Sequence, residues 1–125
     1  MSKIFVFGSN EAGVHGAGAA KYACKYLGAE WGFGEGLTGQ TYALPTKDYN
    51  INSRSLGEIE ASVDLFVEFA RSKPDLTFQV TRIGCGLAGF EDREIAPLFS
   101  NAPSNCEFDS FWKLWLPDHK FWGTF

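Results

Sequence analysis

Two glycine-rich segments hold the residues of this chain best suited to bind a phosphate-bearing ligand. The first, from Ile4 to Ala23, reads IFVFGSNEAGVHGAGAAKYA, and the second, from Phe78 to Ala96, reads FQVTRIGCGLAGFEDREIA. In each, an apolar run typical of a buried strand leads into small residues and then into a helix-like stretch. Backbone N–H groups at glycine turns and helix N-termini attract anions, above all phosphates. The pair therefore predicts one site that grips a ligand such as a diphosphate with its sugars.

Polar side chains near these segments could do acid–base chemistry. His15 lies in the first loop rather than on an apolar face, so we expect a general acid or base, or an exposed loop residue, and not a core residue. Asn10 could bind ribose hydroxyls or a nucleophilic water, and it could equally satisfy a turn. Asp48 is a turn residue or a catalyst. Cys85 has no identifiable histidine partner, so its small size rather than nucleophilicity explains its place between glycines.

The second segment also fits another nucleotide-binding signature. Gly84 to Gly89 matches GxGxxG after a strand and before a helix, and Asp109 could serve as the acidic ribose ligand. A Rossmann-like NAD-binding protein is therefore an alternative, although it leaves the longer first segment unexplained. A Walker A loop is excluded, because GxxxxGK[ST] does not occur.

Composition predicts one cytoplasmic domain spanning residues 1–125. The formal net charge of −4 argues against a nucleic-acid backbone as the main partner, because such binding rests on Lys and Arg. No apolar run approaches the ~20 residues that cross a bilayer, so we expect no membrane contact. The N-terminus does not resemble a signal peptide. Three cysteines without CxxC spacing indicate neither a disulfide framework nor a zinc site, and nothing calls for a cofactor.

Hydrophobic patterning predicts alternating strands and helices. We expect strands at Lys3–Phe7, Thr41–Thr46, Thr77–Ile83 and Asn105–Phe108, and helices at Gly18–Leu27, Ser55–Ser72 and Asp92–Phe99. Four glycines between residues 32 and 39 predict a flexible connection, and residues 109–125 an aromatic tail without clear period. This order implies an α/β domain with a largely parallel sheet, whose ligands bind beyond the carboxyl ends of the strands.

The two loops together resemble the macro domain, a family that binds ADP-ribose and its derivatives. Asn10, five residues and then Gly16-Ala17-Gly18 match the first family loop, and Ile83 to Phe90 matches the second. TYALPTKD and the following amphipathic helix occupy the expected place, so the resemblance covers roughly Ile4 to Phe108. Within the family, the GAG triplet at Gly16 to Gly18 and the sequence RIGCGL at Arg82 to Leu87 look most like the branch that removes terminal ADP-ribose from proteins or DNA.

The chain departs from that branch at three places. The catalytic Lys of the first helix aligns with Cys24, although Lys21 and Lys25 are close by, and the acidic residue after IGCGL falls on Ala88. The usual N-terminal strand is missing, together with its Gly-Asp segment, whose Asp holds adenine in the family. The aromatic tail could form core, an interface or a wall of the adenine pocket.

The resemblance implies a three-layer α/β/α domain with a mixed, largely parallel sheet, and an ADP-ribose-type ligand, free or attached to protein or nucleic acid. Its ligand-binding residues would be Gly8, Ser9, Asn10, Gly16, Ala17, Gly18, Thr46, Gly84, Cys85, Gly86, Leu87, Ala88, Gly89 and Phe90. Catalysis would rest on Asn10 with His15 or Asp48. Two functions follow as hypotheses: a hydrolase acting at the distal ribose, by de-ADP-ribosylation or removal of a 1″-phosphate, or a non-catalytic reader or nucleotide-sequestering module.

Overall fold

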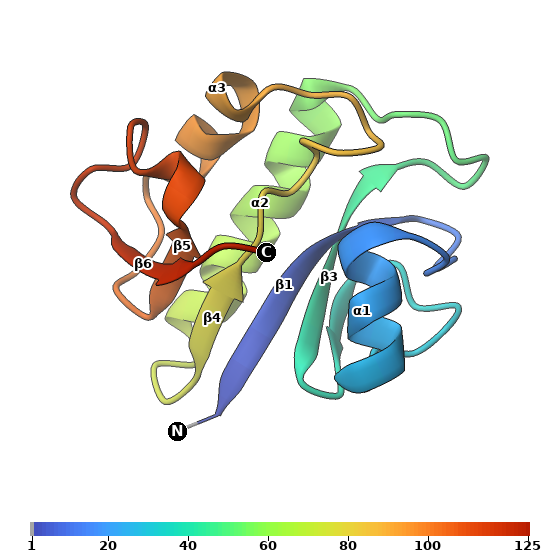
Figure 1. The fold of residues 1–125 in the computed structure, drawn as a ribbon, viewed down its shortest axis with the longest axis horizontal. Coiled ribbons are helices and arrows are strands. Elements are labelled where there is room, and N and C mark those ends of the chain that lie inside the picture. The colour runs from blue at the N-terminus through green and yellow to red at the C-terminus, as the bar shows by residue number, and fades with distance from the viewer. Residues whose placement is uncertain (1) are drawn as a thin grey trace.

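The computed structural model describes residues 2–125, whose strands form one mixed sheet in the order β2-β3-β1-β4-β5-β6 (Figure 1). The strands are β1 (Lys3–Asn10), β2 (Gly36–Thr38), β3 (Thr41–Lys47), β4 (Thr77–Val80), β5 (Cys106–Asp109) and β6 (Lys120–Gly123). Each pairs in parallel with its neighbours except β2, which is antiparallel to β3. The predicted α/β fold with a largely parallel sheet is confirmed.

Helices cover both faces of the sheet and make three layers (Figure 1). Helix α1 (Gly18–Tyr26) lies on one face, and α2 (Leu56–Arg71) and α3 (Asp92–Ile95) lie on the other, with α3 continued by a 3₁₀ turn, η1 (Ala96–Phe99). Because side chains alternate along a strand, Phe5 and Phe7 of β1 belong to the apolar cluster under α1, while Ile4 and Val6 belong to the larger cluster under α2. None of the helices in residues 2–125 has the length and apolar character needed to cross a membrane.

The long helix α2 forms where the sequence predicts it. The Ser55 hydroxyl accepts the Glu58 N–H at 3.2 Å, and the Glu58 carboxylate accepts the Ser55 N–H at 3.0 Å, which is the expected capping box. Helix α1 differs, since its N-cap residue Ala17 provides no side-chain acceptor. The first turn of α1 therefore has no side chain capping its N–H donors, whereas in α2 the Ser55 hydroxyl engages the N–H of Glu58.

Two strand ends differ from the sequence prediction by more than one residue. β1 continues through the first loop's start to Asn10, because it pairs with β3 as far as Lys47. β4 ends at Val80 rather than Ile83. Thr81 N–H still donates to the Val6 carbonyl at 3.1 Å, but Ile83 N–H turns back to the Thr81 carbonyl at 2.8 Å, which starts the second loop.

The glycine-rich connection at residues 32–39 is packed, and the expectation of a flexible segment was wrong. It contains the edge strand β2, and its backbone lies directly against the first loop. A Cβ added to Gly34 would lie 2.1 Å from the Asn10 carbonyl oxygen, and the Ser9 hydroxyl donates to the Gly34 carbonyl. Gly34 therefore permits a close backbone contact that no larger residue allows.

The aromatic tail is part of the fold. Trp112, in the 3₁₀ turn η2 (Ser110–Trp112), is fully buried in the larger cluster. β6 then pairs in parallel with β5 and forms an edge of the sheet, and Trp122 Nε1 donates to the Val80 carbonyl at 2.9 Å. The tail therefore contributes both core and sheet, and its last residues run along the carboxyl edge of the sheet.

Candidate functional site

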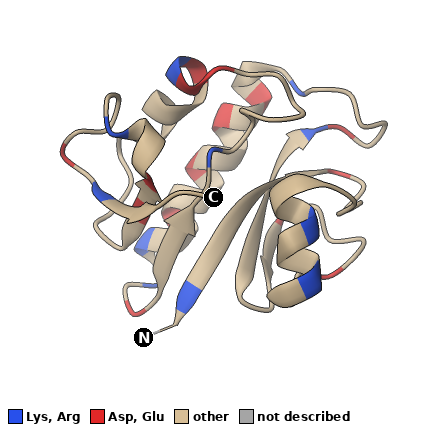
Figure 2. Cartoon of the chain, viewed as in Figure 1, with Lys and Arg blue, Asp and Glu red and all other residues tan. Residues whose placement is uncertain are grey.

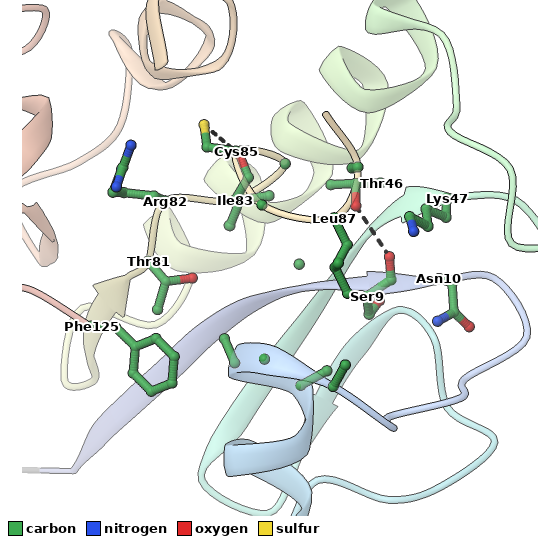
Figure 3. A pocket seen from close by; sticks show the side chains of 18 of the residues that line it. Ser9, Asn10, Thr46, Lys47, Thr81, Arg82, Ile83, Cys85, Leu87 and Phe125 are labelled. Atoms are coloured by element: carbon green, nitrogen blue, oxygen red, sulfur yellow. Dashed lines mark hydrogen bonds between the residues drawn. The ribbon is translucent and has the colours of Figure 1, made fainter. Parts of the chain in front are cut away.

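A pocket of about 480 Å³ opens between the two glycine loops, at the carboxyl ends of β1, β3 and β4 (Figure 3). Its volume is within the range of roughly 300–1,000 Å³ typical of small-ligand sites. It is lined by twelve of the predicted ligand-binding residues: Gly8, Ser9, Asn10, Gly16, Ala17, Gly18, Thr46, Gly84, Cys85, Gly86, Leu87 and Ala88. The loops, which are separated by about 70 residues of sequence, share one pocket.

Two residues predicted to bind ligand lie outside the pocket lining. Gly89, at φ +82°, closes the second loop, and its N–H donates to the Gly86 carbonyl at 3.0 Å. Phe90 N–H donates to the Gly84 carbonyl at 2.9 Å, and its half-buried ring packs against the larger apolar cluster. Phe90 was predicted to bind ligand, and this geometry instead directs its ring to the core.

His15 is buried, and the expectation that it avoids the core was wrong. Only 2% of the residue is exposed, and its Nε2 lies 2.9 Å from the Glu30 carbonyl oxygen. Its ring meets Phe7 and Trp31 with centroid separations of 5.3 and 6.0 Å. The segment after α1 folds over the first loop and covers the imidazole, so His15 does not line the pocket.

Asp48 and Asn10 both act in turns. Asp48 Oδ1 accepts the N–H groups of Asn50 at 2.9 Å and Asn52 at 3.0 Å, and Asp48 does not line the pocket. Asn10 does line it, but its side-chain amide donates to the Val14 carbonyl at 2.8 Å and accepts the Val14 N–H at 2.9 Å. Asn10 therefore closes the first loop and leaves little of its amide for other partners.

Backbone donors border the pocket on two sides. Within residues 2–125, no hydrogen bond engages the N–H groups of Gly18, Ala19 and Ala20 in the first turn of α1. The same holds, over that described range, for the N–H groups of Gly86, Leu87 and Ala88 in the second loop. All six residues line the pocket. The positive end of the α1 dipole adds to these donors, so this part of the pocket is suited to an anion.

The glycines of the loops fall into two groups. Gly84, at φ +78°, adopts a backbone conformation that favours glycine, so the turn itself explains it. Gly16 and Gly86 have no such φ, and a Cβ built on either would meet no atom within 4 Å. The fold therefore does not require glycine at 16 and 86. The absence of side chains at these two positions leaves the pocket surface open beside the free backbone donors.

Ten lining residues were not among the ligand-binding residues that the macro-domain resemblance implied, although Asp109 had been named for the Rossmann-like alternative: Val14, Ala19, Ala20, Lys47, Ile51, Thr81, Arg82, Ile83, Asp109 and Phe125. Lys47 follows the predicted Thr46 and is the sheet partner of Asn10, so strand register would have found it. Phe125 reaches the pocket only because β6 pairs with β5, and no local sequence pattern predicted that pairing. Figure 3 shows Asn10 and Lys47 at one end of the pocket and Thr81 and Phe125 at the other.

Arg82 and Cys85 line the pocket mainly with backbone, since their side chains point away from it (Figure 3). Arg82 Nε and Nη2 donate to the Asp92 carboxylate at 2.8 and 2.6 Å, and Trp112 Nε1 donates to Asp92 Oδ1 at 2.7 Å. The Arg82 guanidinium lowers the pKa of Asp92 to about 2. This network fixes the start of the second loop to the tail.

The surroundings of the Cys85 thiol disfavour the thiolate form that a nucleophile requires. Burial raises its pKa to about 12, and the neighbouring Asp92 carboxylate adds to the shift. Among residues 2–125, no group of three or more His, Cys, Asp or Glu side chains is placed to hold a metal ion. The pocket therefore offers a ligand its backbone N–H donors, the ammonium group of Lys47 and the aromatic ring of Phe125.

Comparison of the chain with protein-family models, with curated proteins and with solved structures found no match.

Proposed function

We propose that this protein binds ADP-ribose or a related NAD-derived nucleotide in the pocket between the two glycine loops. One observation carries the proposal: six backbone N–H groups without hydrogen bonds in residues 2–125 border the same pocket as Gly16 and Gly86, whose glycine identity the fold does not need. Such a surface suits a diphosphate, which approaches backbone donors closely. The resemblance of the loops to the macro domain supports the same ligand class.

Charge supports a small ligand rather than a nucleic-acid backbone. The chain has a formal net charge of −4, and Figure 2 shows acidic and basic residues interspersed along helices and loops. Lys47, at the rim next to Asn10, provides a cation for a phosphate or a ribose hydroxyl. Local donors thus offset the overall negative charge, which explains how an acidic protein can hold an anionic ligand.

The pocket favours binding without turnover over hydrolysis. His15 is buried outside the pocket, Asp48 lies in a turn, and the Cys85 thiol is protonated and directed away. A reader or sequestering module is therefore the first form of the proposal. Hydrolysis at the distal ribose is the second, supported by Asn10 and Lys47 as neighbours at one end of the pocket. Incubation with ADP-ribosylated protein, ADP-ribosylated DNA and ADP-ribose 1″-phosphate separates the two, since only the hydrolase releases product.

The Rossmann-like alternative is less well supported. It uses the second loop alone and requires Asp109 to be free for a ribose. Asp109 is fully buried and already accepts hydrogen bonds from the backbone of Phe111 and Phe125 and from the Thr124 hydroxyl. That alternative predicts an affinity for NAD well above that for ADP-ribose, which a parallel titration of the two ligands measures.

Two valine variants test the proposed site. Gly16→Val and Gly86→Val should fold normally, because both added side chains enter open space, yet they should lose nucleotide binding as the branches fill the anion-binding end. Gly57→Val, in α2 and away from the pocket, is the matched control, since a Cβ there also meets nothing within 4 Å. Calorimetric titration with ADP-ribose, NAD and AMP gives affinities, and melting curves report folding.

A saturating ligand should stabilise the wild-type protein visibly, by about 2.7 kcal/mol at a ligand concentration 100 times the dissociation constant. Wild-type affinity in both folded valine variants would remove the loops from the site. The absence of any melting shift with all three nucleotides would refute the proposed function itself.

A further inference from the structure

We propose that Phe125, held in place by Asp109, is the surface on which the base of the bound nucleotide stacks. The inference rests on the proposed function and specifies which end of the pocket receives the base. It concerns a segment that the two glycine loops do not include, and it assigns a role to the side chain of Phe125 and to the otherwise unexplained burial of Asp109.

The topology brings Phe125 to the pocket. β6 is parallel to β5, which is parallel to β4, so the residues after β6 emerge at the same edge of the sheet as the glycine loops. Thr124 and Phe125 follow β6 directly, and Phe125 lines the pocket. In Figure 3 Phe125 lies at the end opposite Asn10 and Lys47, with the second loop and the start of α1 between them.

Asp109 fixes the position of this segment. Its carboxylate is fully buried, and Oδ2 accepts the Thr124 hydroxyl at 3.0 Å and the Phe125 N–H at 3.2 Å. Oδ1 accepts the Phe111 N–H at 2.9 Å. Hydrogen bonds to an ionised carboxylate are stronger than bonds between neutral groups. Two of them, at consecutive residues, hold the backbone that carries the Phe125 ring, so Asp109 is a positioning residue.

The Phe125 ring is supported but not covered. It meets Phe5 and Tyr22 with centroid separations of 5.5 and 5.3 Å and interplanar angles of 63° and 64°, so neither neighbour lies parallel to it. The residue is 55% exposed although it borders a pocket. An aromatic ring that is held by its neighbours and still open to a cavity can accept a second flat ring by stacking.

The order of the chemical groups in an ADP-ribose-type ligand suggests how such a ligand lies in the pocket. An ADP-ribose-type molecule carries its base at one end, the diphosphate in the middle and the distal ribose at the other end. If the diphosphate lies at the backbone donors of α1 and the second loop, the two remaining parts extend toward the two ends of the pocket. The aromatic end suits the base, and the end with Asn10 and Lys47 suits the hydroxyl-rich ribose.

The test compares a ligand with a base and a ligand without one. Calorimetric titrations use ADP-ribose and inorganic pyrophosphate against wild type, Phe125→Leu, Phe125→Trp and Asp109→Asn. Phe125→Leu keeps an apolar contact for Phe5 and Tyr22 but lacks a flat face. It should weaken ADP-ribose binding by about 5- to 150-fold, the range that alanine substitution gives for one base–aromatic stack, and leave pyrophosphate binding unchanged. Phe125→Trp should keep the wild-type affinity for both ligands.

Asp109→Asn should lower the affinity for ADP-ribose alone, since the amide nitrogen cannot accept the bonds from Thr124 and Phe125. Tyr49→Ala, an aromatic residue that is 73% exposed and does not line the pocket, is the control and should change neither affinity. Melting curves of each variant separate unfolding from loss of the stack.

Two results would overturn the inference while the proposed function stands. One is wild-type affinity of Phe125→Leu for ADP-ribose, and the other is an equal loss for ADP-ribose and pyrophosphate, which would make Phe125 a purely structural residue. A wild-type protein that binds neither ligand would instead refute the proposed function, and the inference with it.

Discussion

The ion pair between Arg82 and Asp92 predicts a defined part of the acid sensitivity of this protein. The pair is bidentate, with N–O distances of 2.8 and 2.6 Å, and it lowers the pKa of Asp92 from 3.8 to about 2. A difference of about 1.8 units corresponds to at most ~2.4 kcal/mol of folding free energy at about 1.36 kcal/mol per unit. The two side chains are 34% and 19% exposed, so solvent screening reduces this to about 1–2 kcal/mol.

The sign follows from the direction of the shift. Because the pKa of Asp92 is lower in the folded state than in the unfolded state, the stabilisation is complete above about pH 4 and is lost as the pH falls toward about 2. Urea unfolding followed by tryptophan fluorescence, at pH 7, 4 and 2.5, measures the free energy of unfolding at each pH. Asp92→Asn should be less stable than wild type at pH 7 by about 1–2 kcal/mol, and the difference should shrink with acidification.

Glu91→Gln is the matched control. Glu91 pairs with Arg93 at 2.6 Å, but both side chains are mostly exposed, at 60% and 73%. Exposed pairs contribute little, so the control should follow the wild-type profile. An identical pH dependence of wild type and Asp92→Asn would show that the Arg82–Asp92 pair does not stabilise the fold and would refute the reasoning.

Three further outcomes are expected. Gly34→Ala should lower stability by about 1–3 kcal/mol and weaken nucleotide binding, since its methyl group would lie 2.1 Å from a carbonyl oxygen of the first loop; Gly57→Ala, with open space around the methyl, should do neither in the same melts and titrations. His15→Ala should reduce the free energy of unfolding by about 2 kcal/mol or more, because a buried ring and its hydrogen bond are removed, and urea curves that match wild type would contradict its core role. At pH 8, iodoacetamide should label Cys85 far more slowly than Cys24, because the Cys85 thiol has a pKa of about 12; equal rates in peptide mapping would contradict this.

The parts of the fold that sequence analysis predicted are those with local signals. β1 and β3 are apolar runs that end in turns, and the capping box of Ser55 and Glu58 marks the start of α2. The parts of the site that the sequence predicted also have local signals, because a glycine-rich loop directly after an apolar strand can be recognised in the sequence. Twelve lining residues came from the two loops and the end of β3.

What was missed depends on partners far away in the chain. β2 and β6 carry no run of apolar residues that marks a strand, and each forms because an existing strand offers an edge. The burial of His15 follows from a segment that covers it after α1. Phe125 reaches the pocket only through β6 and Asp109. None of these contacts leaves a trace in local composition or spacing.

The central position of β1 has a consequence for how the protein folds during synthesis. β1 is made well before both of its neighbours in the sheet: Phe5 pairs with Thr41 on one side and with Gln79 on the other. One hydrogen-bonding edge of an apolar strand therefore stays without its partner until β4 has left the ribosome. Contacts of such sequence separation form slowly and leave the nascent chain prone to association. Phe125 follows both glycine loops in the sequence, so the pocket wall that it forms is made after them.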